Sequence, residues 1–124
     1  MRKGLILFGH GARDPRWAEP FEAVAARVRA HQPDVDVRLA YLEFMAPTLT
    51  EAGDALAAAG CAVVAVQPMF LGTGGHVRRD LPLLVEDLRA RHPATRFTLH
   101  TAIGETGPVM DAMARVAATT LESA

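Results

Sequence analysis

The sequence contains one cysteine, one tryptophan and one tyrosine, and its charges nearly cancel, leaving a formal net charge of −1. A lone cysteine, Cys61, excludes a framework of intramolecular disulfides and favours a reducing compartment. The near-neutral charge provides no basic field that would attract nucleic acid. No apolar run approaches the roughly 20 residues that span a bilayer, and residues 1–4 lead into a strand-like segment rather than a signal peptide. We therefore expect a cytoplasmic protein that binds neither nucleic acid nor membrane.

The length and the apolar content of the chain point to a compact fold. At 124 residues and 13.3 kDa, the chain is long enough to bury a hydrophobic core and too short for two typical domains. Hydrophobic residues make up 50% of it, which is ordinary for an α/β protein. Residues 1–124 are therefore predicted to form a single α/β domain.

Four segments have the pattern of β-strands and alternate with helical segments. Residues 4–9 are apolar throughout and residues 61–67 are apolar up to the final Gln67, as in buried strands. Residues 35–41 and 96–100 instead alternate between apolar and polar side chains. The order βαβαβαβα indicates a four-stranded parallel sheet with helices on both faces. With the apolar strands in the centre, the predicted strand order is 2-1-3-4, a flavodoxin-like pattern without its fifth strand.

A last helix is expected after the turn formed by residues 104–108. Its apolar residues recur at helical spacing, which predicts that one face of this helix packs inward against the sheet. The residues of that face are Val109, Met113, Val116, Ala117 and Leu121.

The strand order has a direct consequence for the position of two histidines. In a 2-1-3-4 sheet the chain leaves strands 1 and 3 in opposite directions, which opens a crevice at their carboxyl ends. His10 ends the first strand, His76 follows the third, and Glu43 follows the second. Two imidazoles and a carboxylate suit a divalent first-row metal and leave positions open for a substrate atom. Either histidine alone is equally consistent with a loop imidazole bonded to nearby backbone, and an exposed carboxylate at a strand end is common.

The same two loops carry basic residues and a glycine-rich segment. Four arginines lie there, and guanidinium groups bind carboxylates or phosphates through paired hydrogen bonds; they are Arg13, Arg16, Arg78 and Arg79. Glycines placed between a strand and a helix permit positive φ angles and a close approach of backbone to a ligand; they are Gly72, Gly74 and Gly75. No lysine and hydroxyl pair follows these glycines, so the segment is not a Walker motif. An anionic ligand other than a nucleotide is predicted.

Apolar side chains adjoin the predicted crevice. Phe44 and Met45 follow Glu43, and Phe70 lies between the third strand and the glycines, with Met69 and Leu71 beside it. Such residues often cap a core. A flat hydrophobic ligand or a second subunit would use them equally well.

Three segments together resemble the short form of the sirohydrochlorin chelatases, the cobaltochelatases of anaerobic cobalamin synthesis. They are HGARDPRW, YLEFMAPTL and PMFLGTGGHVRRDLP, and the resemblance runs over nearly the whole chain in order and spacing. It implies the class II chelatase fold and insertion of a divalent metal, typically cobalt, into the tetrapyrrole sirohydrochlorin without nucleotide hydrolysis. The family's metal-binding histidines correspond to His10 and His76, and its strand-end glutamate corresponds to Glu43. In the fourth loop Glu105 stands where a histidine is expected.

The resemblance assigns further roles to the crevice residues. It implies that His10 and His76 hold the metal and accept pyrrole protons, and that Glu43 orients these groups or relays protons. It also implies that no cofactor is required beyond the metal. The substrate's carboxylates suit Arg13, Arg78 and the glycine N–H groups, and its flat ring suits the Phe and Met side chains. Because related proteins with a single half complete the cleft as homodimers, a homodimer is predicted.

Several alternatives remain open from the sequence. Histidine and carboxylate ligands serve cobalt, nickel and iron alike, so a ferrochelatase or nickel chelatase is an alternative. A non-catalytic metal-binding or delivery module would explain His10 and His76 while leaving the arginines unused. A phosphoryl-accepting domain of similar topology is disfavoured, because no aspartate ends the third strand.

Overall fold

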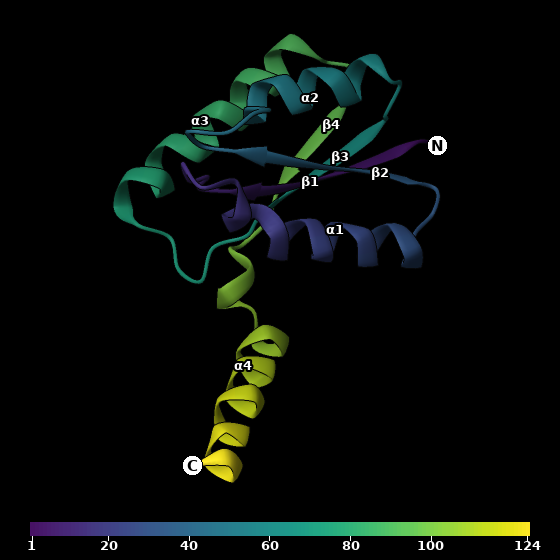
Figure 1. The fold of residues 1–124 in the computed structure, drawn as a ribbon. Helices are drawn as coiled ribbons and strands as arrows, with labels where there is room; N and C mark the ends of the chain where they lie inside the picture. The colour runs from purple at the N-terminus through teal and green to yellow at the C-terminus, as the bar shows by residue number, and fades with distance from the viewer.

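A computed structural model describes residues 1–124 and contains four strands, four α-helices and three short 3₁₀ turns (Figure 1). In chain order these are β1 (Lys3–Gly9), η1 (Pro15–Ala18), α1 (Glu19–His31), β2 (Val35–Tyr41), α2 (Leu49–Ala58), β3 (Val63–Pro68), α3 (Gly75–Arg91), β4 (Arg96–Leu99), η2 (Ile103–Glu105), α4 (Gly107–Thr119) and η3 (Thr120–Ser123). None of the helices is both long and apolar enough to cross a membrane.

The four strands form one parallel sheet in the order β2-β1-β3-β4, which confirms the predicted topology. In the centre of the sheet, Leu5 of β1 lies between Val37 of β2 and Ala65 of β3. Because all strands run the same way, their carboxyl ends meet at a single edge. The loops that follow β1, β2 and β3 therefore lie next to one another.

Helices cover the two faces of the sheet unequally. In Figure 1, α2 and α3 lie together on one face, whereas α1 is the only helix packed on the other. The larger hydrophobic core lies under α2 and α3 and includes Ile6, Phe8 and Phe97. A smaller cluster under α1 is centred on Leu7, Ala25 and Val37. The direction of the crossover connections explains this division. The connection from β1 to β2 runs towards one edge of the sheet, and the connection from β3 to β4 runs towards the other edge. Because both connections are right-handed, their helices α1 and α3 lie on opposite faces.

Local sequence signals define the ends of α2. The Thr48 hydroxyl accepts a hydrogen bond from the Glu51 N–H at 3.1 Å, and the Glu51 carboxylate accepts one from the Thr48 N–H at 2.9 Å. This reciprocal capping box satisfies two donors that the first turn leaves free. At the other end, Gly60 adopts a φ of 85°, the left-handed conformation that often ends a helix.

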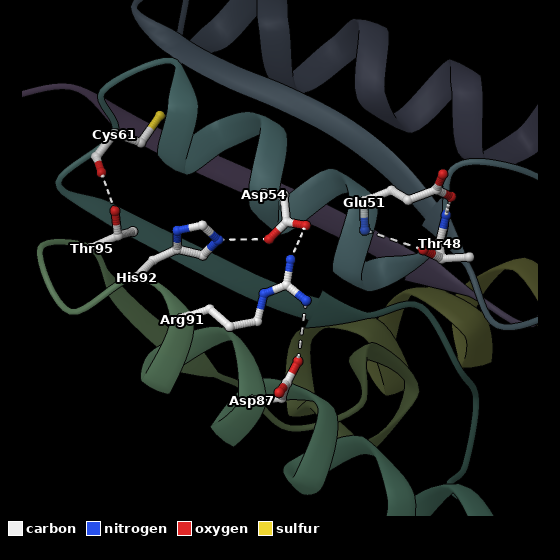
Figure 2. A network of polar contacts seen from close by, with 8 residues as sticks. All are labelled: Thr48, Glu51, Asp54, Cys61, Asp87, Arg91, His92 and Thr95. Carbon is white, nitrogen blue, oxygen red and sulfur yellow. Dashed lines mark hydrogen bonds and ion pairs between the residues drawn. The ribbon is translucent and has the colours of Figure 1, made fainter.

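A polar network joins α2 to the carboxyl end of α3 (Figure 2). The Asp54 carboxylate on α2 accepts from the Arg91 guanidinium at 2.5 Å and lies 2.6 Å from Nε2 of His92. Nearby, the Thr95 hydroxyl donates to the Cys61 carbonyl at 2.9 Å. These contacts fix the two helices at the amino edge of the sheet, away from the loops that carry His10 and His76, and they give His92 a structural role.

The predicted packing of the last helix is wrong. No residue of α4 is buried, and the helix projects away from the layered body (Figure 1). Met113 and Val116 are 39% and 68% exposed, and Leu121 beyond the helix is 78% exposed. The helical periodicity was correct, but periodicity does not specify which surface an apolar face meets.

Candidate active site

A cleft of about 400 Å³ opens at the carboxyl edge of the sheet, between the loop after β1, the loop after β2 and the first turns of α3. His10, Glu43 and His76 all line it, as the strand order predicted. The remaining walls are mostly apolar and come from Phe8, Leu42, Val77, Asp80, Leu81 and Leu84. The topology thus brings together three side chains that are far apart in the sequence.

His10 is exposed and lies directly after β1, on a support of aromatic rings. Its imidazole lies against the Phe70 ring, with centroids 4.4 Å apart and planes tilted by 35°. Phe70 is only 4% exposed and makes an edge contact with Phe8 at 5.9 Å. Phe70, assigned to substrate contact from the sequence, is therefore largely covered in this arrangement and acts as a floor beneath the imidazole.

Backbone contacts join the His10 loop to Glu43. The Glu43 N–H donates to the His10 carbonyl at 3.0 Å. Gly11 has a φ of 86°, and a Cβ at this position would lie 1.9 Å from the Glu43 carbonyl oxygen. Only glycine permits both the conformation and this close approach. Sequence reasoning missed Gly11, although its position immediately after the candidate ligand His10 was a usable signal.

His76 lies in the first turn of α3, which Gly74 caps without a side-chain hydrogen bond. Its side chain is 82% exposed, and Nε2 lies 3.1 Å from the Asp80 carboxylate one turn later. A carboxylate on one imidazole nitrogen orients the ring and leaves Nδ1 for another partner. The sequence analysis did not assign Asp80 to the site, although its i,i+4 spacing from His76 was a usable signal for this pairing.

The donors of the cleft do not form a closed metal site. No group of three His, Cys, Asp or Glu side chains lies close enough together to hold an ion. His10, Glu43 and His76 are exposed on flexible side chains around one hollow. Such an open arrangement suits an ion that enters and leaves better than one held permanently.

The arginines of the two loops have different surroundings. Arg13 stacks on Phe44, with the guanidinium carbon 4.9 Å from the ring centroid, and Phe44 is 57% exposed. Arg16 instead forms an ion pair with Asp14 at 2.8 Å, and this contact lowers the pKa of the Asp14 carboxyl. Arg13 therefore stacks on an exposed ring beside the cleft-lining residue Glu43 but does not itself line the cleft, whereas Arg16 is engaged in the cap of η1.

Arg78 faces a second, smaller hollow of about 240 Å³ rather than the first. This hollow is also lined by His100 and Glu105, and Leu81 separates it from the histidine cleft. An Arg78 N–H donates to the Thr73 carbonyl at 3.3 Å. The two hollows share Leu81 and are therefore adjacent.

The glycine segment after β3 does not use the positive φ angles that glycine permits. The glycines with positive φ are Gly11 and Gly60. A Cβ at Gly72, Gly74 or Gly75 would meet nothing within 4 Å. What these glycines provide is an uncovered backbone beside the cleft. Met45, also predicted at the crevice, is half-buried in the loop after β2.

Comparison with known proteins agrees with this architecture. A family model described as CbiX matches residues 4–120. A sirohydrochlorin cobaltochelatase of Methanosarcina barkeri is 32% identical over 82 residues, covering 66% of this chain and 63% of the relative. A sirohydrochlorin ferrochelatase of Bacillus subtilis is 26% identical over 104 residues, covering 84% of this chain and 40% of the relative.

The crystal structure of a cobalamin biosynthesis CbiX protein from Marinobacter aquaeolei superposes with a TM-score of 0.85 at 30% identity. That match covers 98% of this chain and 99% of the other. The fold and the histidine-lined cleft thus define a chelatase-like α/β protein. With the family model matched over residues 4–120, the chain belongs to the CbiX family.

Proposed function

We propose that this chain inserts a divalent metal ion, foremost Co²⁺, into sirohydrochlorin in cobalamin or related tetrapyrrole synthesis. The observation that carries the proposal is the cleft that joins His10, Glu43 and His76 at one edge of the sheet. The cobaltochelatase and ferrochelatase relatives support the same chemistry, although this chain spans only about three fifths of the cobaltochelatase and two fifths of the ferrochelatase.

In this proposal, the imidazoles of His10 and His76 bind the incoming metal ion. His10 and His76 offer neutral nitrogen ligands and Glu43 a carboxylate, a set that binds first-row divalent ions without saturating their coordination. Because the three donors surround an open hollow, the incoming ion draws them together and keeps positions free for ring nitrogens. No cofactor enters the reaction beyond the metal substrate.

Insertion also requires proton acceptors. The ion replaces two pyrrole N–H protons, so M²⁺ and the free ring give the metallated ring and two protons. An imidazole that releases the ion to the ring becomes free to accept one of these protons. Asp80, 3.1 Å from His76, stabilises the imidazolium that results, and Glu43 relays the second proton.

In this proposal, residues of the loops next to the cleft bind a flat, polyanionic ring. Phe44 and Met45 provide apolar contact, and Arg13 lies over the Phe44 ring with its remaining N–H groups available to a carboxylate. Further binding groups lie towards the second hollow. They are the Arg78 guanidinium, which lines that hollow, and the uncovered backbone of Gly72, Gly74 and Gly75. A tetrapyrrole is broad enough to reach both hollows.

We further propose that the reaction takes place in the cytoplasm, in a homodimer whose two clefts face a shared cavity. A single cleft leaves one face of a macrocycle in water, whereas ligand sites commonly bury about 70–90% of a ligand. Cys61 is a free, buried thiol whose pKa is raised by burial, which agrees with a protein that has no need of an oxidising compartment.

The proposal is tested by mixing the purified protein with sirohydrochlorin and Co²⁺ and recording the tetrapyrrole absorption spectrum. We expect the spectrum of the metallated ring to appear much faster than in the same mixture without protein. Fe²⁺ and Ni²⁺ in parallel reactions decide among the three metals. Tight metal binding with no acceleration of insertion for any of them would contradict the proposal and favour the delivery module.

A further inference from the structure

Phe44 is the one non-glycine residue of the chain with a positive φ, which is 65°. The left-handed region disfavours residues that carry a Cβ, and a bulky side chain there is an outlier. Such a conformation persists only where the surrounding structure imposes it, and it is found most often at functional sites. Phe44 directly follows Glu43, which lines the cleft. The strained residue therefore lies beside a candidate metal ligand.

The side chain of Phe44 does not account for this strain. The ring is 57% exposed, so burial of the ring in the core does not offset the cost of the conformation. The Arg13 guanidinium carbon lies 4.9 Å from the ring centroid, and a cation–π contact at an exposed site is weak. The cause of the conformation therefore lies in the backbone of the loop.

The backbone of Glu43 is held tightly against the loop after β1. Its N–H donates to the His10 carbonyl at 3.0 Å. Its carbonyl oxygen lies so close to Gly11 that a Cβ on Gly11 would be 1.9 Å away, and Gly11 itself has a φ of 86°. Two left-handed residues, one in each loop, thus adjoin the same segment of chain. Gly11 makes room for the Glu43 carbonyl, and Phe44 turns the chain after it.

The loop also has to return to the end of β2 within a few residues. The Tyr41 N–H donates to the Pro47 carbonyl at 2.9 Å, and Tyr41 pairs with Thr48 in an isolated β-bridge. Residues 44–46 therefore contain the whole reversal between the hydrogen-bonded Glu43 and Pro47. A left-handed residue at the start of this reversal changes the direction of the chain at a single position, as in the turns that require a positive φ.

This turn determines which side chains face the cleft. Successive residues of an extended strand point to opposite sides, whereas Leu42 and Glu43 both line the cleft and Phe44 does not. We propose that Phe44 is a positioning residue whose left-handed backbone, rather than its ring, directs the Glu43 carboxylate into the cleft. The inference rests on the proposed function for the role of that carboxylate, and it adds a residue that acts through Glu43.

A matched pair of variants, Phe44→Asn and Phe44→Val, separates the backbone from the ring. Both remove the ring, but asparagine adopts the left-handed conformation readily, whereas the β-branched valine opposes it. Hydrogen exchange of the Glu43 amide reports its bond to His10 and requires neither metal nor tetrapyrrole. Phe44→Val is expected to raise this exchange rate by roughly 5-fold or more, and Phe44→Asn to change it by less than about 2-fold.

Leu71→Val is the control, because Leu71 is 72% exposed but does not have a positive φ. It is expected to leave the exchange of the Glu43 amide unchanged. Equal exchange rates in Phe44→Asn and Phe44→Val would overturn the proposal, since both variants lack the ring. Equal midpoints of urea denaturation would also overturn it, because Phe44→Asn is expected to be the more stable of the two.

Titration with Co²⁺ tests whether the effect passes through the carboxylate. Phe44→Val is expected to bind Co²⁺ roughly 3-fold or more weakly than Phe44→Asn, and this difference is expected to vanish when Glu43→Gln is added to both. A difference that persists with Glu43→Gln would overturn the proposal. A wild-type Co²⁺ affinity in Glu43→Gln alone would contradict the proposed function instead, whereas the exchange rates still support or overturn the inference.

Discussion

The imidazole of His10 rests on the buried ring of Phe70, with centroids 4.4 Å apart. The contact joins a residue of the β1 loop to one of the loop after β3, so both sides of the crevice contribute to the position of one candidate ligand. It also restricts the rotamers of an otherwise exposed side chain. The hydrophobic core therefore extends to the floor of the cleft and orients its chemistry.

Phe70→Leu keeps apolar volume in the core but removes the aromatic face beneath His10. Aromatic contacts are worth about 0.5–1.5 kcal/mol, so Co²⁺ affinity is expected to fall by roughly 2- to 10-fold in a titration. Phe97→Leu is the matched control, because Phe97 is also buried in the core but belongs to β4 and does not line the cleft. An equal loss of affinity in both variants would mean that general destabilisation, rather than the contact with His10, is responsible.

His10→Ala and His76→Ala are each expected to lower the rate of metal insertion by roughly 100-fold or more, since each removes a ligand and a proton acceptor. Both side chains are exposed, so the thermal midpoint of unfolding is expected to change little. His31→Ala, in the last turn of α1 at the opposite edge of the sheet, serves as the control. Near wild-type rates of metal insertion in both His10→Ala and His76→Ala would contradict the proposed mechanism.

Arg13→Ala and Arg78→Ala are expected to raise KM more than they lower kcat, because a grip on substrate carboxylates is shared by ground and transition states. Arg13→Lys is also expected to raise KM, since lysine keeps the charge but loses the planar stacking on Phe44. Steady-state kinetics against sirohydrochlorin measure these effects, with Arg27→Ala on the outer surface of α1 as control. An unchanged KM in both alanine variants would make these arginines ordinary surface charges.

Gly11→Ala is expected to lower the free energy of unfolding by roughly 1–3 kcal/mol, the usual cost of a strained backbone conformation. The φ of 86° and the Cβ position 1.9 Å from the Glu43 carbonyl oxygen are the two causes. Gly72→Ala, where a Cβ meets nothing within 4 Å, is expected to change stability by less than about 0.5 kcal/mol. Urea denaturation of both variants measures the difference. Equal stability would show that the loop after β1 relaxes freely.

Asp36 on β2 is expected to contribute a pH-dependent part of the stability. Its hydrogen bond with Arg38, together with the charges of Arg38 and Arg2, lowers the pKa of the Asp36 carboxyl in the folded protein. A lowered pKa stabilises the fold above the ordinary carboxyl pKa, and this stabilisation is lost as the pH falls through the folded value. The difference in unfolding free energy between wild type and Asp36→Asn is therefore expected to shrink between neutral pH and about pH 3.

The same difference for Asp34→Asn provides the control, because Asp34 is exposed and forms no ion pair. Chemical denaturation at a series of pH values gives both curves. A wild-type advantage over Asp36→Asn that stays constant down to acid pH would contradict the assignment.

The sequence alone was sufficient for the sheet and for the position of the crevice. Continuously apolar segments identified the central strands, alternating segments identified the edge strands, and right-handed crossovers then left little choice of topology. Because parallel strands end at one edge, the positions of His10, Glu43 and His76 along the chain were enough to place them in one cleft. These are consequences of local pattern and of chain connectivity, both of which are written in the order of residues.

Only the tertiary structure decided which contacts those residues make. The support of His10 by Phe70 and the dependence of the Glu43 loop on Gly11 arise from distances across loops, which no periodicity encodes. The same holds for α4: its periodicity correctly predicted a helix, but the predicted packing was wrong, because no residue of α4 is buried. The close contact of Gly104 with the Leu71 backbone fixes the turn from which the helix leaves. A sequence pattern specifies that an apolar surface must be covered, and the three-dimensional path of the chain determines which surface is within reach.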